Sequence, residues 1–129
     1  MAERVDDATI RDEDALWRRL LPGWIHLSAT GDVLISSVAF KDRRSGELSV
    51  HLAALADQRR VLAFRPGDGL AELLARIPRS VGCPIVRDPD PDDPSHALIC
   101  SSRTHGKLRV AKEMAKSARL LVKPEGNSV

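Results

Sequence analysis

Residues 48–52 alternate strictly between apolar and polar side chains. Successive side chains of a β-strand point to opposite faces of a sheet, so this pattern predicts a half-buried strand. Leu48, Val50 and Leu52 would face the core, whereas Ser49 and His51 would lie on the opposite face.

Short apolar runs predict several more strands. The runs 24–27 and 33–35 flank the turn-rich segment 29–32, which indicates a β-hairpin. The runs 85–86 and 97–100 predict two strands joined by the loop 88–96. The run 61–64 fits either a strand or the end of a helix.

Helical spacing of apolar residues predicts three helices. The first would run from 12 to 21 and end at Pro22, with its apolar face formed by Leu16, Trp17, Leu20 and Leu21. The second would open with a cap at Asp68 and end at Pro78, with its apolar face formed by Leu70, Leu73, Leu74 and Ile77. The third would cover 105–118, and residues 120–122 would either continue it or form an edge strand.

Strands with interspersed helices, and no regular β-α-β alternation, predict an α+β fold. We expect a single two-layer domain over residues 1–124, with a small, mostly antiparallel sheet of about five short strands and about three helices. Residues 1–11 and 125–129 are expected to be frayed.

Aromatic residues make up only 3% of the chain, and none is tyrosine. The four aromatics are Trp17, Trp24, Phe40 and Phe64. All four lie in or beside apolar segments, so we expect them to be needed inside the protein. Proteins that bind single-stranded nucleic acid stack bases on exposed aromatic rings. Any contact with nucleic acid is therefore expected to involve mainly the backbone phosphates.

Several common catalytic motifs are absent from the sequence. It contains no P-loop, GxGxxG, GxSxG or HExxH motif and no zinc-finger spacing, which argues against nucleotide-dependent enzymes and serine hydrolases. Cys83 and Cys100 are expected to be buried, reduced thiols. We expect no cofactor.

Basic residues are concentrated near the C-terminus, although the net charge of the chain is only +2. Those on or beside the third predicted helix are Arg103, Lys107, Arg109, Lys112, Lys116, Arg119 and Lys123. Such a face attracts phosphate groups or an acidic protein surface, and the alternative is a solvated face without a partner. The same helix would carry an apolar stripe through which a homodimer could form, made of Leu108, Ala111, Ala115, Ala118 and Val122.

The loop 88–96 combines four carboxylates, three prolines and a histidine. Hard cations bind several oxygen ligands at once, which makes Asp88, Asp90, Asp92 and His96 weak candidates for a cation site. The spacing departs from that of a calcium-binding loop. Asp93 stands where such a loop has its turn glycine, and Ile99 stands where it has its last carboxylate ligand. We therefore predict no metal site, and a rigid solvated connection or a docking loop for a basic partner are the alternatives.

His51 lies on one predicted strand, and His96 lies beside another. If those strands were neighbours, His51 and His96 could act as base and acid in metal-independent cleavage of RNA. Candidate residues around them are Ser49, Ser101, Arg87 and Arg103, with the arginines holding a phosphate. Imidazoles more than ~10 Å apart would exclude this mechanism.

The sequence alone favours a small, non-enzymatic interaction protein. Its basic C-terminal helix would dock on an acidic macromolecular partner, either a protein or nucleic-acid phosphates. The alternative is a compact metal-independent ribonuclease or similar phosphoryl-transfer enzyme that uses His51 and His96 with Arg87. No apolar run approaches the ~18 residues of a membrane-spanning helix, and the acidic N-terminus does not resemble a secretion signal, so we expect a cytoplasmic protein without membrane contact.

Overall fold

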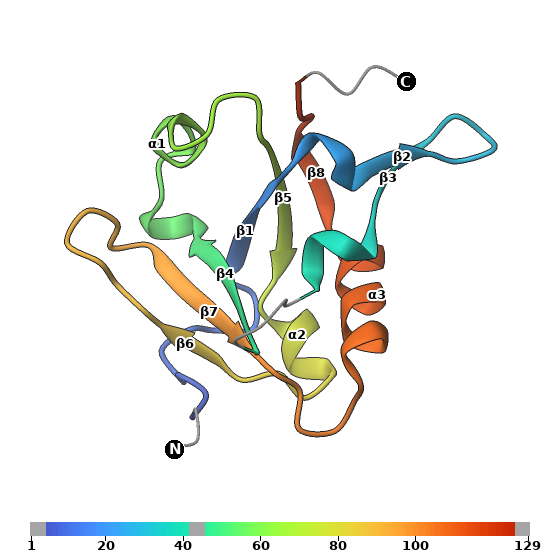
Figure 1. Ribbon diagram of the computed structural model, residues 1–129. Helices are drawn as coiled ribbons and strands as arrows, with labels where there is room; N and C mark the ends of the chain where they lie inside the picture. Colours follow the sequence, from blue (N-terminus) through green and yellow to red (C-terminus); the bar gives the residue numbers. More distant parts are fainter. Residues whose placement is uncertain (1–4, 42–45, 126–129) are drawn as a thin grey trace.

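The computed structural model describes residues 5–41 and 46–125 (Figure 1). The strands are β1 (Ala15–Leu20), β2 (Ile25–Leu27), β3 (Val33–Ile35), β4 (Glu47–Leu52), β5 (Gly69–Leu74), β6 (Ile85–Arg87), β7 (His96–Cys100) and β8 (Arg119–Val122). The α-helices are α1 (Gln58–Ala63), α2 (Arg76–Ser80) and α3 (Lys107–Ser117), and single-turn 3₁₀ helices cover η1 (Pro22–Trp24), η2 (Ser37–Phe40) and η3 (Ala53–Leu55).

Six of the strands form one sheet in the order β6-β7-β4-β1-β5-β8, and β2 and β3 form a separate hairpin. Each pairing between these neighbours is antiparallel. The predicted α+β class and the mostly antiparallel sheet are therefore confirmed. The described part of the chain has more strands than the five expected, because two segments predicted as helices contain the strands β1 and β5, and the segment left open between helix and strand forms β8.

The prediction of a helix over 12–21 is wrong, since β1 occupies most of this segment. Leu16 and Leu20 are fully buried and four residues apart, a spacing that suits one face of a helix or one face of a strand. Hydrogen bonding to β4 on one side and β5 on the other makes β1 a central strand.

The prediction of a helix from Asp68 to Pro78 is also wrong. Strand β5 covers the first part and α2 the second, with Pro78 inside α2. Leu70 on one face of β5 and Leu73 on the other are both buried. A strand covered on both faces reads as a continuous apolar run, which periodicity does not distinguish from a buried helix.

Most of the remaining predictions are confirmed. The hairpin β2–β3, the half-buried strand β4 and the antiparallel pair β6–β7 all form where the sequence indicates. The ambiguous run 61–64 belongs to the end of α1, and residues 120–122 lie in β8 at the edge of the sheet. Cys83 and Cys100 are buried, and no disulfide joins them.

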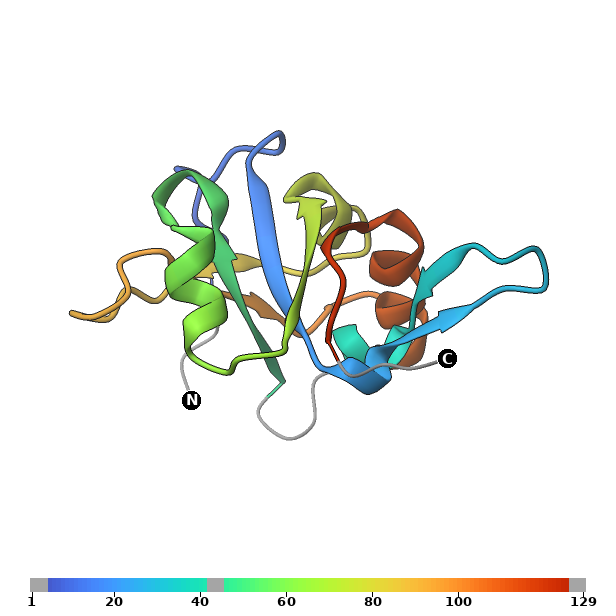
Figure 2. The same ribbon diagram turned by 90° about the horizontal axis from the view of Figure 1, so that it is seen from above.

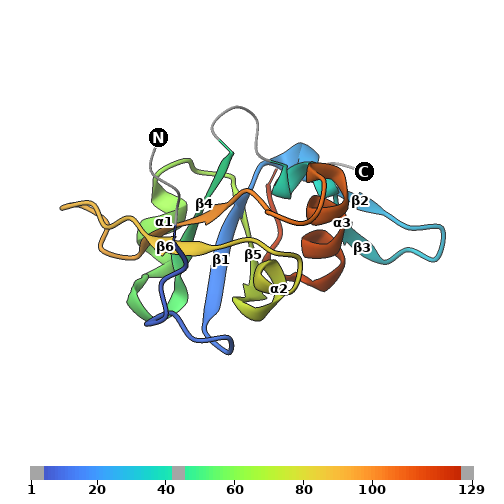
Figure 3. The ribbon, with the colours of Figure 1, turned by 90° about the horizontal axis from the view of Figure 1, so that it is seen from below.

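The two faces of the sheet have different coverings. One face carries the main core, in which Leu16, Val50 and Ile99 pack with Val110 and Met114 of α3. Helix α1 lies on the other side of the central strands (Figure 2). The hairpin β2–β3 and the loop between β6 and β7 project at opposite ends of the molecule (Figure 3).

The predicted apolar stripe of α3 is partly wrong. Leu108 is 51% exposed, whereas Val110 and Met114, which lie outside the predicted stripe, are buried together with Ala111. The helix therefore turns a different face to the core than the spacing of its small residues indicates.

Residues 5–11 pack on the domain, although residues 1–11 were expected to fray; residues 1–4 and 126–129 of the two predicted frayed ends lie outside the described residues. Ile10 is buried in the main core, and the backbone N–H of Asp7 donates to the carbonyl of Ile85. Arg79 of α2 forms ion pairs with Asp6 and Asp12, which hold this segment against α2. Within the described ranges no helix is long and apolar enough to cross a bilayer.

Candidate active site

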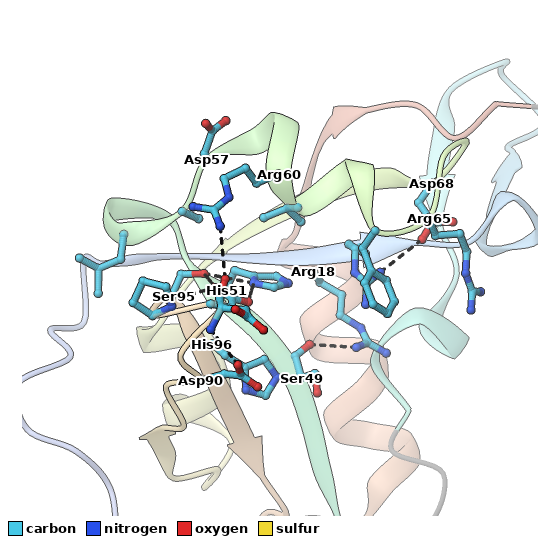
Figure 4. Close-up of a pocket in the computed structure, with 18 of the residues that line it drawn as sticks. Arg18, Ser49, His51, Asp57, Arg60, Arg65, Asp68, Asp90, Ser95 and His96 are labelled. Atoms are coloured by element: carbon cyan, nitrogen blue, oxygen red, sulfur yellow. Dashed lines mark hydrogen bonds and ion pairs between the residues drawn. The ribbon is translucent and has the colours of Figure 1, made fainter.

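The structure brings the two predicted histidines together. Strand β4 pairs with β7 so that His51 lies directly opposite His96, and both side chains therefore share one face of the sheet. The ring centroids are 6.0 Å apart, and the rings meet edge to face at 75° (Figure 4). The separation is well inside the limit of ~10 Å that the acid–base mechanism allows.

The ring of His51 is held at one nitrogen. Its Nδ1 lies 3.0 Å from Oδ2 of Asp93 and 3.2 Å from Oγ of Ser95. Ser95 is almost completely buried, and its hydroxyl donates to the other carboxylate oxygen of Asp93. These contacts fix the orientation of the imidazole in the way that a carboxylate orients a catalytic histidine.

His96 is held in a similar way by a different carboxylate. Its Nδ1 lies 3.0 Å from Oδ2 of Asp88 and 3.1 Å from the Asp88 carbonyl oxygen. In the part of the chain that the structure describes, no residue hydrogen-bonds the Nε2 atom of either histidine. Each ring therefore keeps one nitrogen available for proton transfer.

The loop between β6 and β7 places both carboxylates. The backbone N–H of Asp88 donates to the carbonyl of His96, which brings the two ends of the loop together. Asp90 and Asp93 exchange two backbone hydrogen bonds, and this tight turn returns the chain toward β4. The loop predicted as a solvated connection thus supplies the partners of both imidazoles.

Burial controls the protonation of His51. It lowers the pKa of His51 below its usual value, because the charged ring loses its hydration, and nearby Arg19 and His96 act in the same direction. The carboxylate of Asp93 opposes this effect without cancelling it. Burial raises the pKa of Asp93, but the hydrogen bond from Ser95 and the positive charge of His51 outweigh it, so the pKa of Asp93 is lowered.

The two histidines line a cleft of about 890 Å³. One wall consists of α1 and the segments on either side of it, and the other consists of the loop 90–95. Four arginines and five aspartates line this cleft, so its charges are nearly balanced. Two of the carboxylates already have partners there, since Asp93 pairs with His51 and Asp68 with Arg19.

Arg19 is the cation that the sequence prediction missed. The β1–β4 register pairs Trp17 with His51, so Arg19, two residues further along β1, lies on the same face of the sheet. Its charge is close enough to affect the pKa of His51. Alternation along 16–20 would have placed Arg19 opposite the buried Leu16 and Leu20, but this signal was lost when the segment was interpreted as a helix.

Arg87, proposed as the phosphate ligand, lies elsewhere. Its guanidinium donates to Thr9 Oγ1 and lies 3.6 Å from Oδ2 of Asp7, both in the N-terminal segment. Arg103 belongs to the connection between β7 and α3, where its backbone N–H bonds Gly82. The assignment of either arginine to a phosphate beside the histidines is therefore not supported by the geometry.

The serines do not form a nucleophile with these histidines. Ser95 contacts the Nδ1 side of His51, the side that Asp93 also occupies, whereas a serine nucleophile requires the opposite nitrogen. Ser101 donates to the carbonyl of Gly46, outside the cleft. Ser49 lines the cleft and is exposed.

The weak metal candidates do not converge. Asp88 contacts His96, while Asp90 accepts a hydrogen bond from the backbone N–H of Asp92. Among residues 5–41 and 46–125, no three His, Cys, Asp or Glu side chains come together as a possible metal site.

The basic C-terminal residues lie away from the cleft. Helix α3 packs on the core face of the sheet, whereas the histidines occupy the other face. The exposed residues of this set are Arg103, Lys107, Arg109, Lys112, Lys116, Arg119 and Lys123. Arg119 forms an ion pair of 2.9 Å with Glu72, which also accepts a hydrogen bond from Trp17.

Comparison of the chain with protein-family models, with curated proteins and with solved structures gives no match. The functional argument therefore rests on the site itself.

Proposed function

We propose that this protein is a metal-independent phosphodiesterase of the ribonuclease type. The observation that carries the proposal is the cross-strand pair of His51 and His96, 6.0 Å apart, each held at Nδ1 by its own carboxylate. Two imidazoles at this separation can contact both the attacking and the leaving oxygen of one phosphate.

His51 suits the role of general base. Burial lowers its pKa, so the ring is neutral at pH 7, and the Nδ1–H bond to Asp93 leaves the lone pair on Nε2. His96 takes the role of general acid. Asp88 lies beside its ring and compensates the positive charge of the imidazolium.

The chemistry of cleavage follows from these roles. Nε2 of His51 removes the proton from a ribose 2′-hydroxyl, and the 2′-oxygen forms a bond to phosphorus. The bond between phosphorus and the 5′-oxygen breaks, and that oxygen takes the proton from Nε2 of His96. The products are a 2′,3′-cyclic phosphate and a free 5′-hydroxyl, and hydrolysis of the cyclic ester uses the same groups with reversed roles.

The charges of the cleft suit a phosphodiester. Arg19 supplies a cation near His51, but the arginines and aspartates that line the cleft nearly balance, so the cleft lacks the excess of positive charge that a ligand with several adjacent negative charges requires. Each diester of an RNA strand carries one negative charge, and successive diesters are separated by a nucleoside. We therefore expect a short stretch of RNA rather than a nucleoside triphosphate, whose charges are adjacent, as the ligand.

A second candidate function is docking of the basic face of α3 on an acidic macromolecule. It is supported by the exposure of Arg109, Lys112 and Lys116 along this helix. The two functions use opposite faces of the sheet and are therefore separable by mutation.

The test is cleavage of a fluorescently labelled RNA oligonucleotide in the presence of EDTA. His51→Gln and His96→Gln should each lower the rate by about 10²- to 10⁴-fold, the usual contribution of a general acid or base. His26→Gln is the matched control, because His26 is exposed on the hairpin β2–β3. This variant should cleave at the wild-type rate.

The variant Arg109→Glu/Lys112→Glu/Lys116→Glu separates the two candidates. It should cleave the oligonucleotide like wild type, while any association through α3 should be lost at moderate salt. Absence of cleavage by the wild-type protein, or cleavage that persists in both active-site variants, contradicts the ribonuclease proposal.

A further inference from the structure

Phe64 is an exposed aromatic ring in a protein that has only four aromatic residues. Its side chain is 75% exposed, at the residue that follows α1. Burial of a phenylalanine side chain stabilises a fold, and the exposed Phe64 contributes little in this way. The expectation that all four aromatics lie inside is therefore wrong for Phe64.

The exposed ring is held in place by a cation. The guanidinium carbon of Arg19 lies 4.4 Å from the centroid of the Phe64 ring, within the range of a cation–π contact. The same guanidinium lies 4.0 Å from Oδ2 of Asp68, whose side chain is buried. The contacts of Arg19 with Phe64 on one side and with Asp68 on the other thus connect an exposed ring to a buried carboxylate.

Phe64 and the histidines line the same cleft. Arg19 connects them, because its guanidinium contacts Phe64 and its charge acts on His51. A ligand whose phosphate lies between His51 and His96 would therefore extend along the cleft toward the aromatic ring.

We propose that Phe64 is a stacking platform for a nucleobase next to the scissile phosphate, so that the substrate is an unpaired RNA strand. This inference rests on the proposed function and specifies its substrate. A base in a duplex is stacked on both faces and paired at its edge, so only an unpaired base offers a free face to the ring. Arg19 would lie between the stacked base and the diester and bind the phosphate oxygens.

The experiment measures binding separately from cleavage. A 2′-O-methyl RNA tetranucleotide lacks the nucleophilic hydroxyl and is not cut by this chemistry, and its dissociation constant is measured by calorimetry. A second ligand has the same sugar–phosphate backbone without bases. The variants are Phe64→Ala and Phe64→Trp, together with Leu27→Ala as the matched control.

Leu27 is a suitable control because it is a 45% exposed apolar side chain on β2, is not among the residues that line the cleft, and has no π-face. Stacking of one base on an aromatic side chain contributes about 1–3 kcal/mol, which corresponds to about 5- to 150-fold in affinity. Phe64→Ala should weaken binding of the tetranucleotide by this factor, whereas Phe64→Trp and Leu27→Ala should retain wild-type affinity. On the abasic ligand, Phe64→Ala and wild type should bind equally.

Equal binding of the tetranucleotide by Phe64→Ala and wild type would overturn the platform, and so would an equal loss on the abasic ligand. These outcomes are independent of cleavage. If RNA is cleaved but binding does not depend on Phe64, the ribonuclease proposal is supported and the stacking role of Phe64 is contradicted. If binding depends on Phe64 but RNA is never cut, the platform stands and the ribonuclease proposal fails.

Discussion

Burial and a neighbouring carboxylate shift the pKa of His51 in opposite directions. Burial lowers the pKa of His51 and is the larger effect, while Asp93 raises it. The pKa of His51 in the folded protein therefore lies below the value of about 6.5 expected for a histidine in the unfolded chain. Between these two values the unfolded chain binds more protons, so this histidine's contribution to stability is complete above pH 6.5 and decreases as the pH falls below it.

Asp93→Asn should lower the pKa of His51 further, because it removes the negative charge and leaves the burial unchanged. The midpoint is measured by NMR titration of the imidazole resonances in wild type and variant. We expect it below 6.5 in wild type and lower still in Asp93→Asn, and the acidic limb of the kcat/KM profile should shift in the same direction. A midpoint above 6.5 in wild type would show that burial is not the larger effect, and an increase in the variant would show that the carboxylate does not raise the pKa of His51.

The site could be predicted from the sequence only in part. Alternation along 48–52 correctly places Ser49 and His51 on the face opposite Leu48 and Val50. The position of His51 opposite His96 could not be predicted, because it depends on the pairing of β4 with β7. The order of strands in a sheet depends on the packing of the whole chain, and local sequence patterns do not predict it.

At the scale of elements, β1 and β5 show where periodicity fails. Leu16 and Leu20 satisfy both the helical and the strand period. Strand β5 has buried leucines on both faces, Leu70 on one and Leu73 on the other, and its one polar residue, Glu72, is itself half-buried, so the sequence shows no clear solvent face. Arg19 was missed for the same reason, because its place in the cleft follows only from the strand assignment.

Gly69 at the start of β5 lies unusually close to the chain that follows β8. A Cβ atom at this position would lie 2.4 Å from the carbonyl oxygen of Val122 and 2.6 Å from Cδ of Pro124. Gly69→Ala should therefore displace the end of β8 and lower the free energy of unfolding by about 1–3 kcal/mol, the usual cost of overpacking. Denaturant titration measures this change.

Gly23→Ala is the control for that substitution, since a Cβ atom there would meet nothing within 4 Å. Its stability should remain within about 0.5 kcal/mol of wild type. Equal stability of Gly69→Ala and Gly23→Ala would mean that β8 does not pack against β5 as the structure shows.

At the scale of the whole molecule, the sheet separates two charged surfaces. The cleft with His51 and His96 lies on one face, and the basic side of α3 lies beyond the other. The net charge of +2 therefore conceals a nearly balanced cleft and a basic helix. The basic residues favour docking when the sequence is considered alone, whereas the cross-strand histidine pair favours phosphodiester cleavage.

We propose that His51 and His96 act on one phosphodiester as base and acid. The most direct test compares a ribodinucleotide with uridine 3′-(4-nitrophenyl phosphate), whose nitrophenolate leaves without a proton. His96→Gln should lower kcat/KM for the dinucleotide by about 10²- to 10⁴-fold but for the nitrophenyl ester by less than about tenfold, whereas His51→Gln should impair both substrates equally. Equal losses on both substrates in His96→Gln, or a nitrophenyl ester cleaved normally by His51→Gln, would contradict this division of roles.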